Sequence, residues 1–255
     1  MWNKSLAMSF KWLAVVAALM AHINTVSAQP AGKAVTYQSG GMDYEGYYVS
    51  VEQGAPLLLL LHDWDGLTSY ERDRAEMLAE MGFAVFAADL FGKGVRPTEV
   101  ADKRQHTGEL YKDREKMRRL MQAAMTKGAE LNGSDVTVAF GYCFGGAAVL
   151  ELARSGVELA GFASFHGGLS TPEGQDYKAT QGKVLVFHGT ADSMISMNDF
   201  ASLADELEAA AVDHEMIAYG GAPHAFTVFG SDRYRQEADT QSWVRFTRFL
   251  KSVSE

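Results

Sequence analysis

The only cysteine of the chain, Cys143, lies in the stretch Gly-Tyr-Cys-Phe-Gly-Gly over residues 141–146. An apolar run ends at Gly141, and small residues after the cysteine lead into a segment of strong helix propensity. Strand, sharp turn and helix in this order form a nucleophile elbow, whose apex residue exposes its side chain above the sheet. Gly141 and Gly145 stand where strand and helix pass too close for a β-carbon. This pattern favours a nucleophilic thiol; the alternative is that Cys143 is a small apolar residue of the core.

A cysteine nucleophile needs a base, and the base needs an acid that orients it. His224 lies in the glycine-rich stretch Gly-Gly-Ala-Pro-His-Ala-Phe, and Asp192 ends the stretch His-Gly-Thr-Ala-Asp. The order cysteine, aspartate, histidine along the chain is that of the triad in α/β-hydrolases. We therefore predict that Cys143 is the nucleophile, His224 the base and Asp192 the acid. The alternative for Asp192 is a cap of a helix or turn.

Acyl transfer also needs backbone N–H groups that stabilise the oxyanion of the tetrahedral intermediate. The N–H of Phe144, the residue after the nucleophile, is one predicted donor, and that of Trp64, in the loop after Leu61, is the other. We further expect the helix that begins near Phe144, together with a protonated His224, to lower the pKa of the Cys143 thiol.

Three further histidines, His62, His166 and His188, each follow an apolar run. They show no paired spacing such as His-x-His, so we interpret them as hydrogen-bonded structural residues and predict no metal site. The glycines around Cys143 lack the G-x-G-x-x-G spacing of a dinucleotide loop, so we predict no nucleotide cofactor and disfavour a reductase.

The segments that must position these residues alternate between strands and helices. Strands are predicted over residues 34–38, 44–51, 56–61, 83–88, 136–140, 159–165, 183–187 and 214–219. Helices are predicted over 69–81, 109–131, 147–153, 199–211 and 237–251, and a long surface loop over 92–106. The continuous apolar run at 56–61 is typical of a strand buried on both faces of a parallel sheet.

This alternation predicts an α/β fold of the α/β-hydrolase type, with a mostly parallel, doubly wound sheet flanked by helices and an antiparallel pair of N-terminal strands. In such sheets, ligand sites lie beyond the carboxyl ends of the strands. Asp63, Cys143, Asp192 and His224 all follow predicted strands directly, so we expect them to meet at one edge.

The N-terminal segment has the features of a signal peptide. Two lysines, Lys4 and Lys11, precede an apolar run over residues 12–20, and Val-Ser-Ala forms a small-residue cleavage site that ends at Ala28. We therefore expect a signal peptide over residues 1–28 and a single domain over 29–255. The protein would be exported, periplasmic or secreted, with no membrane association after cleavage. An uncleaved signal anchor is the alternative.

The chain is acidic, with a formal net charge of −9 over 255 residues. This charge argues against nucleic acid and against anionic membrane surfaces as partners. One cysteine cannot form an internal disulfide, and a lone thiol in an oxidising compartment favours a chemical role.

The chain resembles the dienelactone hydrolase family of α/β-hydrolases. The matching stretches are G-Y-C-F-G-G at residues 141–146, H-G-T-A-D at 188–192, P-H-A-F at 223–226, and those that begin at His62 and Asp89. The resemblance covers residues 35–249, and the cysteine elbow is its most specific part. It implies that Cys143, Asp192 and His224 form the triad.

Two positions depart from the family's pattern. The family usually has a glutamate just before the oxyanion-hole residue, where it interacts with the resting cysteine; Asp63 stands there, one methylene shorter. Dienelactone enzymes carry an arginine four residues after the triad histidine, which pairs with the substrate carboxylate. Val228 occupies that position, and Arg96 or Arg104 is an alternative source of a cation. An apolar residue there disfavours a carboxylate-bearing substrate, whose charge would be unpaired.

The sequence therefore predicts a monomeric hydrolase of small esters or lactones, or of thioesters, that works through an acyl-cysteine intermediate without a cofactor. The alternative from another class is a non-catalytic protein on the same scaffold, either a ligand-binding protein or a thiol-redox sensor. The departures at Asp63 and Val228 motivate this alternative.

Overall fold

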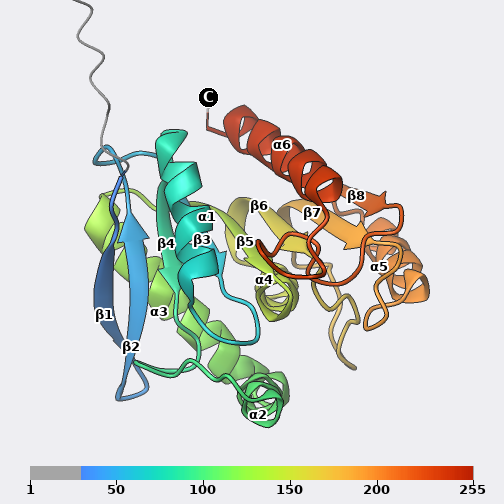
Figure 1. The fold of residues 1–255 in the computed structure, drawn as a ribbon, viewed down its shortest axis with the longest axis horizontal. Coiled ribbons are helices and arrows are strands. Elements are labelled where there is room, and N and C mark those ends of the chain that lie inside the picture. Colours follow the sequence, from blue (N-terminus) through green and yellow to red (C-terminus); the bar gives the residue numbers. More distant parts are fainter. Residues whose placement is uncertain (1–29, 255) are drawn as a thin grey trace, which may run out of the picture.

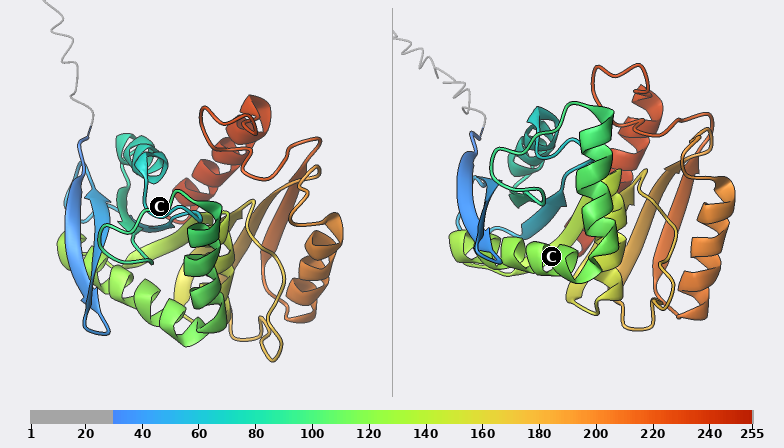
Figure 2. Two further views of the ribbon diagram at one scale, coloured as in Figure 1. Left: turned by 60° about the horizontal axis from the view of Figure 1, so that its bottom comes forward. Right: turned by 90° about the horizontal axis from the view of Figure 1, so that it is seen from below.

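The computed structural model describes residues 30–254, and the predicted signal peptide lies outside them. An eight-stranded sheet carries helices on both faces (Figures 1 and 2). The strands are β1 (Lys33–Ser39), β2 (Met42–Val49), β3 (Leu57–Leu61), β4 (Ala84–Ala88), β5 (Val136–Tyr142), β6 (Glu158–Phe165), β7 (Gln181–Gly189) and β8 (His214–Tyr219). The helices are α1 (Ser69–Glu80), α2 (Val100–Lys112), α3 (Arg114–Asn132), α4 (Phe144–Arg154), α5 (Met197–Ala209) and α6 (Gln236–Ser252). Within residues 30–254, no helix is long and apolar enough to cross a membrane.

The strand order is β1-β2-β4-β3-β5-β6-β7-β8. Strands β3 to β8 all run parallel to their neighbours within the order β4-β3-β5-β6-β7-β8. Strands β1 and β2 pair antiparallel with each other, and β2 pairs antiparallel with β4. This topology confirms the predicted mostly parallel sheet with antiparallel N-terminal strands. It also brings the carboxyl ends of β3, β5, β6, β7 and β8 to one edge.

The side chains of β3 pack into hydrophobic cores on both faces of the sheet. Leu57, Leu59 and Leu61 belong to the core beneath α3, α4 and α5, while Leu58 and Leu60 belong to the core beneath α1 and α6. All five side chains are fully buried. Successive residues of a strand point to opposite faces, so a run of leucines suits a central strand that is covered on both faces.

The segment before β5 differs from the sequence prediction. The expected loop over residues 92–106 contains the first turns of α2, and the expected single helix over 109–131 is two helices that meet at Asp113. The Asp113 carboxylate accepts a hydrogen bond of 2.8 Å from the N–H of Lys116. An aspartate in this role starts a new helix at the expense of continuing the old one, and it turns α2 toward the carboxyl edge of the sheet.

The predicted steric need for glycine around Cys143 is confirmed. A β-carbon on Gly145 would lie 2.1 Å from the carbonyl oxygen of Leu61, and one on Gly141 would lie 2.5 Å from the backbone of Gly145. Strand β3, strand β5 and the first turn of α4 therefore pack backbone against backbone at this point.

We predict that Gly145→Ala lowers the free energy of unfolding by roughly 2–3 kcal/mol, because backbone atoms rather than a flexible side chain must move to admit the methyl group. Gly108→Ala is the matched control, since a β-carbon there meets nothing within 4 Å. In helix α2, that change should stabilise the protein by up to about 1 kcal/mol. Urea unfolding measures both, and equal stability of Gly145→Ala and the wild type would contradict the packing argument.

Candidate active site

Cys143 lies at the turn between β5 and α4 in a backbone conformation that non-glycine residues rarely adopt, with φ 51° and ψ −111°. Two hydrogen bonds hold it there: its N–H donates to the carbonyl of Phe165 at 3.0 Å, and its carbonyl accepts from the N–H of Ala147 at 3.2 Å. Such strain persists where the surrounding structure fixes it, and it is typical of functional sites. The turn aims the sulfur away from the strand axis and toward the edge where the other strands end.

The structure brings Cys143, His224 and Asp192 into direct contact. Nε2 of His224 lies 3.1 Å from Sγ of Cys143, and Nδ1 of His224 lies 2.8 Å from Oδ2 of Asp192. Asp192 follows β7 and His224 follows β8, so three separate strand ends supply the three side chains. Both Asp192 and His224 are buried.

The environment of Asp192 keeps its carboxylate charged. Burial alone would raise its pKa, but the hydrogen bond from His224 and those from the N–H groups of Ile195 and Met194 outweigh burial and hold the pKa below its ordinary value. The two backbone bonds measure 3.0 and 2.8 Å. A charged Asp192 accepts a hydrogen bond from Nδ1–H of His224, which leaves Nε2 free to accept a proton from the thiol.

The expectation of a lowered thiol pKa is wrong. The residue is half-buried as a whole, but protein atoms surround its sulfur, and this burial raises the pKa of Cys143 well above the ordinary value. The charge of Asp63 acts in the same direction and the N–H of Phe144 in the other. The helix N-terminus is thus present, as predicted, but burial and nearby carboxylates outweigh it. The resting site therefore holds a neutral thiol that donates to Nε2 of His224.

The loop after β3 lies beside the thiol because Gly145 packs on the carbonyl groups of Leu61 and His62. Trp64 follows in this loop, and its side chain is half-buried. The N–H of Phe144 is directed at the sulfur of Cys143. The roles of Trp64 and Phe144 as oxyanion donors remain predictions.

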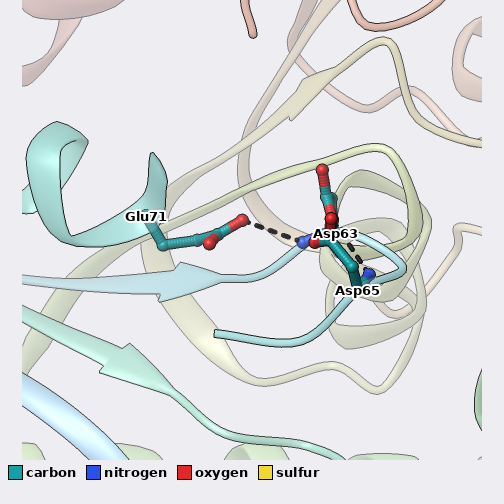
Figure 3. A group of neighbouring side chains, drawn as sticks. All are labelled: Asp63, Asp65 and Glu71. Atoms are coloured by element: carbon teal, nitrogen blue, oxygen red, sulfur yellow. Dashed lines mark hydrogen bonds between the residues drawn. The ribbon is translucent and has the colours of Figure 1, made fainter. Parts of the chain in front are cut away.

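Asp63, Asp65 and Glu71 bring carboxylate oxygens within 4.8 Å of one another, and Figure 3 shows them around the start of this loop. Burial, followed by its contacts with Asp65 and Glu71, raises the pKa of Asp63 well above its ordinary value. Glu71 accepts hydrogen bonds from the N–H and hydroxyl of Thr68 at 2.8 and 2.9 Å, and a longer one from the N–H of Asp63 at 3.3 Å. Since Glu71 is committed to these bonds, the cluster fastens the loop and does not offer three free metal ligands.

Helix α2, which was expected to begin as loop, contributes two residues that sequence reasoning missed. Tyr111 packs edge-on against Phe144, with ring centroids 5.4 Å apart. Burial raises the pKa of its hydroxyl, and so does repulsion between its phenolate form and the thiolate form of Cys143, which places that group close to the sulfur. Nζ of Lys103 lies 5.1 Å from the ring centre of Trp64 and 3.5 Å from Oδ2 of Asp65.

The two arginines considered as partners for a substrate carboxylate make other contacts or face solvent. Arg96 donates to the carbonyl groups of Leu67 and Val95 at 2.5 and 2.6 Å and pairs with Asp89 at 3.6 Å. It therefore holds the loop after β4. Arg104 is exposed on α2. Val228 packs against the core beneath α1 and α6.

The three other histidines differ in their surroundings. His62 fits the prediction of a hydrogen-bonded structural residue, because its Nδ1 lies 2.6 Å from the carbonyl of Asp63 and its Nε2 accepts from the N–H of Leu90. The prediction is wrong for His188: neither ring nitrogen has a partner among residues 30–254, and the ring stacks on Phe200 at 5.4 Å. Aromatic packing under α5 holds it instead, and burial lowers its pKa.

We predict that iodoacetamide alkylates Cys143 with a pH midpoint above the ordinary thiol value of about 8.5, because the thiolate forms only above the raised pKa. Asp63→Asn should lower the midpoint by removing a negative charge beside the sulfur. Asp176→Asn, which alters an exposed carboxylate paired with Lys178, is the control and should leave it unchanged. A wild-type midpoint at or below 8.5 would show that the thiolate is preformed.

The similarity to known proteins extends over most of the chain. The family model described as "Dienelactone hydrolase family" matches residues 44–254. Two relatives named "Putative carboxymethylenebutenolidase" are similar: that of Aquifex aeolicus is 24% identical, with 87% of this chain and 98% of the relative covered, and that of Synechocystis is 25% identical, with 86% and 95% covered.

Solved structures give the same result. A dienelactone hydrolase-like promiscuous phosphotriesterase from metagenomic libraries superposes with a TM-score of 0.82 and 29% identity, over 89% of this chain and 99% of that one. The Klebsiella pneumoniae protein named "Putative Dienelactone Hydrolase" shares the fold at a TM-score of 0.78 and 18% identity, over 87% of this chain and 98% of that one. With its cysteine elbow on an eight-stranded, mostly parallel sheet, this chain belongs to the dienelactone hydrolase family.

Proposed function

We propose that this protein hydrolyses small neutral esters or lactones through Cys143, His224 and Asp192. The observation that carries the proposal is the unbroken line of contacts from Sγ to Nε2 and from Nδ1 to Oδ2 at 3.1 and 2.8 Å. A redox sensor or a ligand-binding protein would not need a buried acid and a histidine aligned on the thiol in this way.

In the proposed reaction, the neutral thiol loses its proton only as it attacks. Nε2 of His224 accepts that proton while Sγ of Cys143 forms a bond to the acyl carbon, and charged Asp192 stabilises the imidazolium. The carbonyl oxygen becomes an oxyanion facing the N–H groups of Phe144 and Trp64. When the bond to the leaving oxygen breaks, His224 returns the proton to it, and an alcohol departs from an acyl-cysteine.

The second half of the reaction uses the same groups. Water takes the place of the alcohol, gives a proton to Nε2 of His224 and adds to the acyl carbon. Collapse of this second intermediate breaks the carbon–sulfur bond, releases a carboxylic acid and restores the thiol. A thioester would follow the same course with a thiol as its leaving group.

The surroundings favour a neutral substrate over a carboxylate-bearing one. Asp63 and Asp65 lie close enough to the sulfur for their charges to act on it, Val228 is apolar, and Arg96 is committed to Leu67 and Asp89. A substrate carboxylate near Cys143 would therefore meet carboxyl groups, and Lys103, the cation that α2 brings to this loop, is already paired with Asp65.

Neutral phosphotriesters are a second candidate class. The specific support is the 29% identity and near-complete overlap with a protein named as a promiscuous phosphotriesterase. A triester has no charge of its own, so the carboxyl groups near Cys143 would not repel it. The cysteine sulfur would attack phosphorus in place of carbon, and the P–O bond to the leaving group would break as His224 returns the proton to that oxygen.

We predict that Cys143→Ala and His224→Ala each lower kcat/KM for p-nitrophenyl acetate by about 10³-fold or more, because the remaining members of such a triad cannot act alone. Asp192→Asn should follow with a loss of at least about 10²-fold. His214→Gln, at the opposite end of β8, is the control. The same variants tested on a neutral phosphotriester decide the second candidate, and full ester turnover by Cys143→Ala would refute the mechanism.

We also predict that p-nitrophenyl butyrate is hydrolysed with a kcat/KM about tenfold or more above that of mono-p-nitrophenyl succinate. The reason is that an unpaired polar group in the site costs on the order of 1–3 kcal/mol. Added salt should narrow the difference, since ions screen the repulsion. Faster turnover of the succinate would mean that a cation near the site binds carboxylates.

A further inference from the structure

A buried polar network lies directly behind the candidate base. Thr227, three residues after His224, is fully buried, and its hydroxyl contacts both Nε2 of His166 at 2.8 Å and the hydroxyl of Tyr70 at 2.6 Å. The ring of His166 in turn packs edge-on against the ring of His224, with centroids 5.3 Å apart and planes at 64°. Thr227 thus connects the loop of His224 to the end of β6 and to helix α1.

The backbone of Thr227 is held as firmly as its side chain. Its carbonyl accepts a hydrogen bond of 2.8 Å from the guanidinium of Arg74, which is 1% exposed. Arg74 also pairs with Asp239 of α6, and the ring of Phe229 stacks on it with 4.1 Å from Cζ to the ring centre. Thr227 is therefore held by Tyr70 and Arg74 of α1 and by His166 at the end of β6, and Arg74 is itself held by Asp239 of α6.

One set of donors satisfies both hydroxyl groups of this network. The hydroxyl oxygen of Tyr70 accepts from Nε of Arg74 at 3.4 Å, so its proton can be donated to Thr227. The hydroxyl of Thr227 can then donate to Nε2 of His166 in the tautomer whose ring proton is on Nδ1, an atom without a partner among residues 30–254. Burial and the nearby His224 lower the pKa of His166 well below its ordinary value, which keeps this ring neutral.

The backbone on both sides of the contact is strained. Ala225, next to His224, has φ 63°, and His166 has φ 40°. These are two of the four non-glycine residues with positive φ among the described residues. Strained residues keep such conformations only where surrounding contacts enforce them, and Thr227, two residues after Ala225, bonds to the ring of His166 through its hydroxyl.

We infer that Thr227 is a positioning residue of the reaction: its hydroxyl locks His166 against the ring of His224 and so keeps Nε2 aimed at Cys143. This inference rests on the proposed hydrolysis. It assigns Thr227 no contact with substrate, because the side chain is enclosed by Tyr70 and His166. A general base must lie within hydrogen-bond distance of the proton that it accepts, so a small displacement of the base lowers the rate by a large factor.

The test compares three variants. Thr227→Val keeps the shape but removes the hydroxyl, Thr227→Ser restores the hydroxyl, and Thr247→Val is the matched control. Thr247 is also buried, but its hydroxyl bonds only to carbonyl groups of its own helix, at Trp243 and Val244. With p-nitrophenyl butyrate, we expect Thr227→Val to lower kcat by roughly 10- to 100-fold, with KM within about twofold of the wild-type value.

Thr227→Ser should retain most of kcat, and Thr247→Val should match the wild type. Equal kcat in Thr227→Val and Thr247→Val would overturn the inference, as would an equal loss in Thr227→Val and Thr227→Ser. If the wild type shows no turnover that depends on Cys143, then the proposed function fails instead.

A spectroscopic measurement separates the two failures, because it needs no substrate. The Nδ1 proton of His224, bonded to Asp192, should give a downfield NMR resonance that is absent in His224→Ala. We expect this resonance to broaden or vanish in Thr227→Val and to persist in Thr227→Ser and Thr247→Val. An unchanged resonance in Thr227→Val would show that His224 is held without the network.

Discussion

The close approach of three backbone segments around Cys143 is the constraint on which the rest of the site depends. The end of β3, the end of β5 and the first turn of α4 touch at Gly141 and Gly145 with no room for a β-carbon. This contact forces Cys143 into its strained turn and brings the loop of Asp63 and Trp64 beside the sulfur. The parallel sheet brings the other two residues to the sulfur, because β7 and β8 end at the same edge and are followed by Asp192 and His224.

The electrostatics of the site follow from this packing. Enclosing the sulfur between a helix start and a carboxyl-rich loop raises the pKa of Cys143, although a helix N-terminus alone would lower it. A neutral thiol is less exposed to oxidation, since thiolate character governs that reaction. A neutral thiol also needs a base aimed at its proton, so the reaction depends on the orientation of His224. Buried Arg74 and Thr227 hold the loop that carries His224.

The fold and the three contacting residues could be predicted from the sequence because their signals are local. A run of five leucines, a cysteine between spaced glycines, and polar residues directly after apolar runs each carry their own meaning. The Asp113 cap is a local feature that the continuous helical pattern of residues 109–131 hides; it splits one apparent helix into two and so brings Tyr111 and Lys103 to the site. Other features depend on residues that come together only on folding, as Asp63, Asp65 and Glu71 do. The position of His188, whose ring nitrogens have no hydrogen-bond partner among residues 30–254, likewise depends on packing against Phe200 of α5.

The account's central claim is that Cys143 forms a covalent bond to the acyl group of its substrate. Rapid acid quenching during turnover of p-nitrophenyl acetate, followed by mass spectrometry of the peptides, tests this directly. The account predicts an acetyl group on Cys143 together with an initial burst of p-nitrophenol that approaches one equivalent per protein. Steady turnover with the thiol of Cys143 unmodified, or with the acetyl group on another side chain, would contradict it.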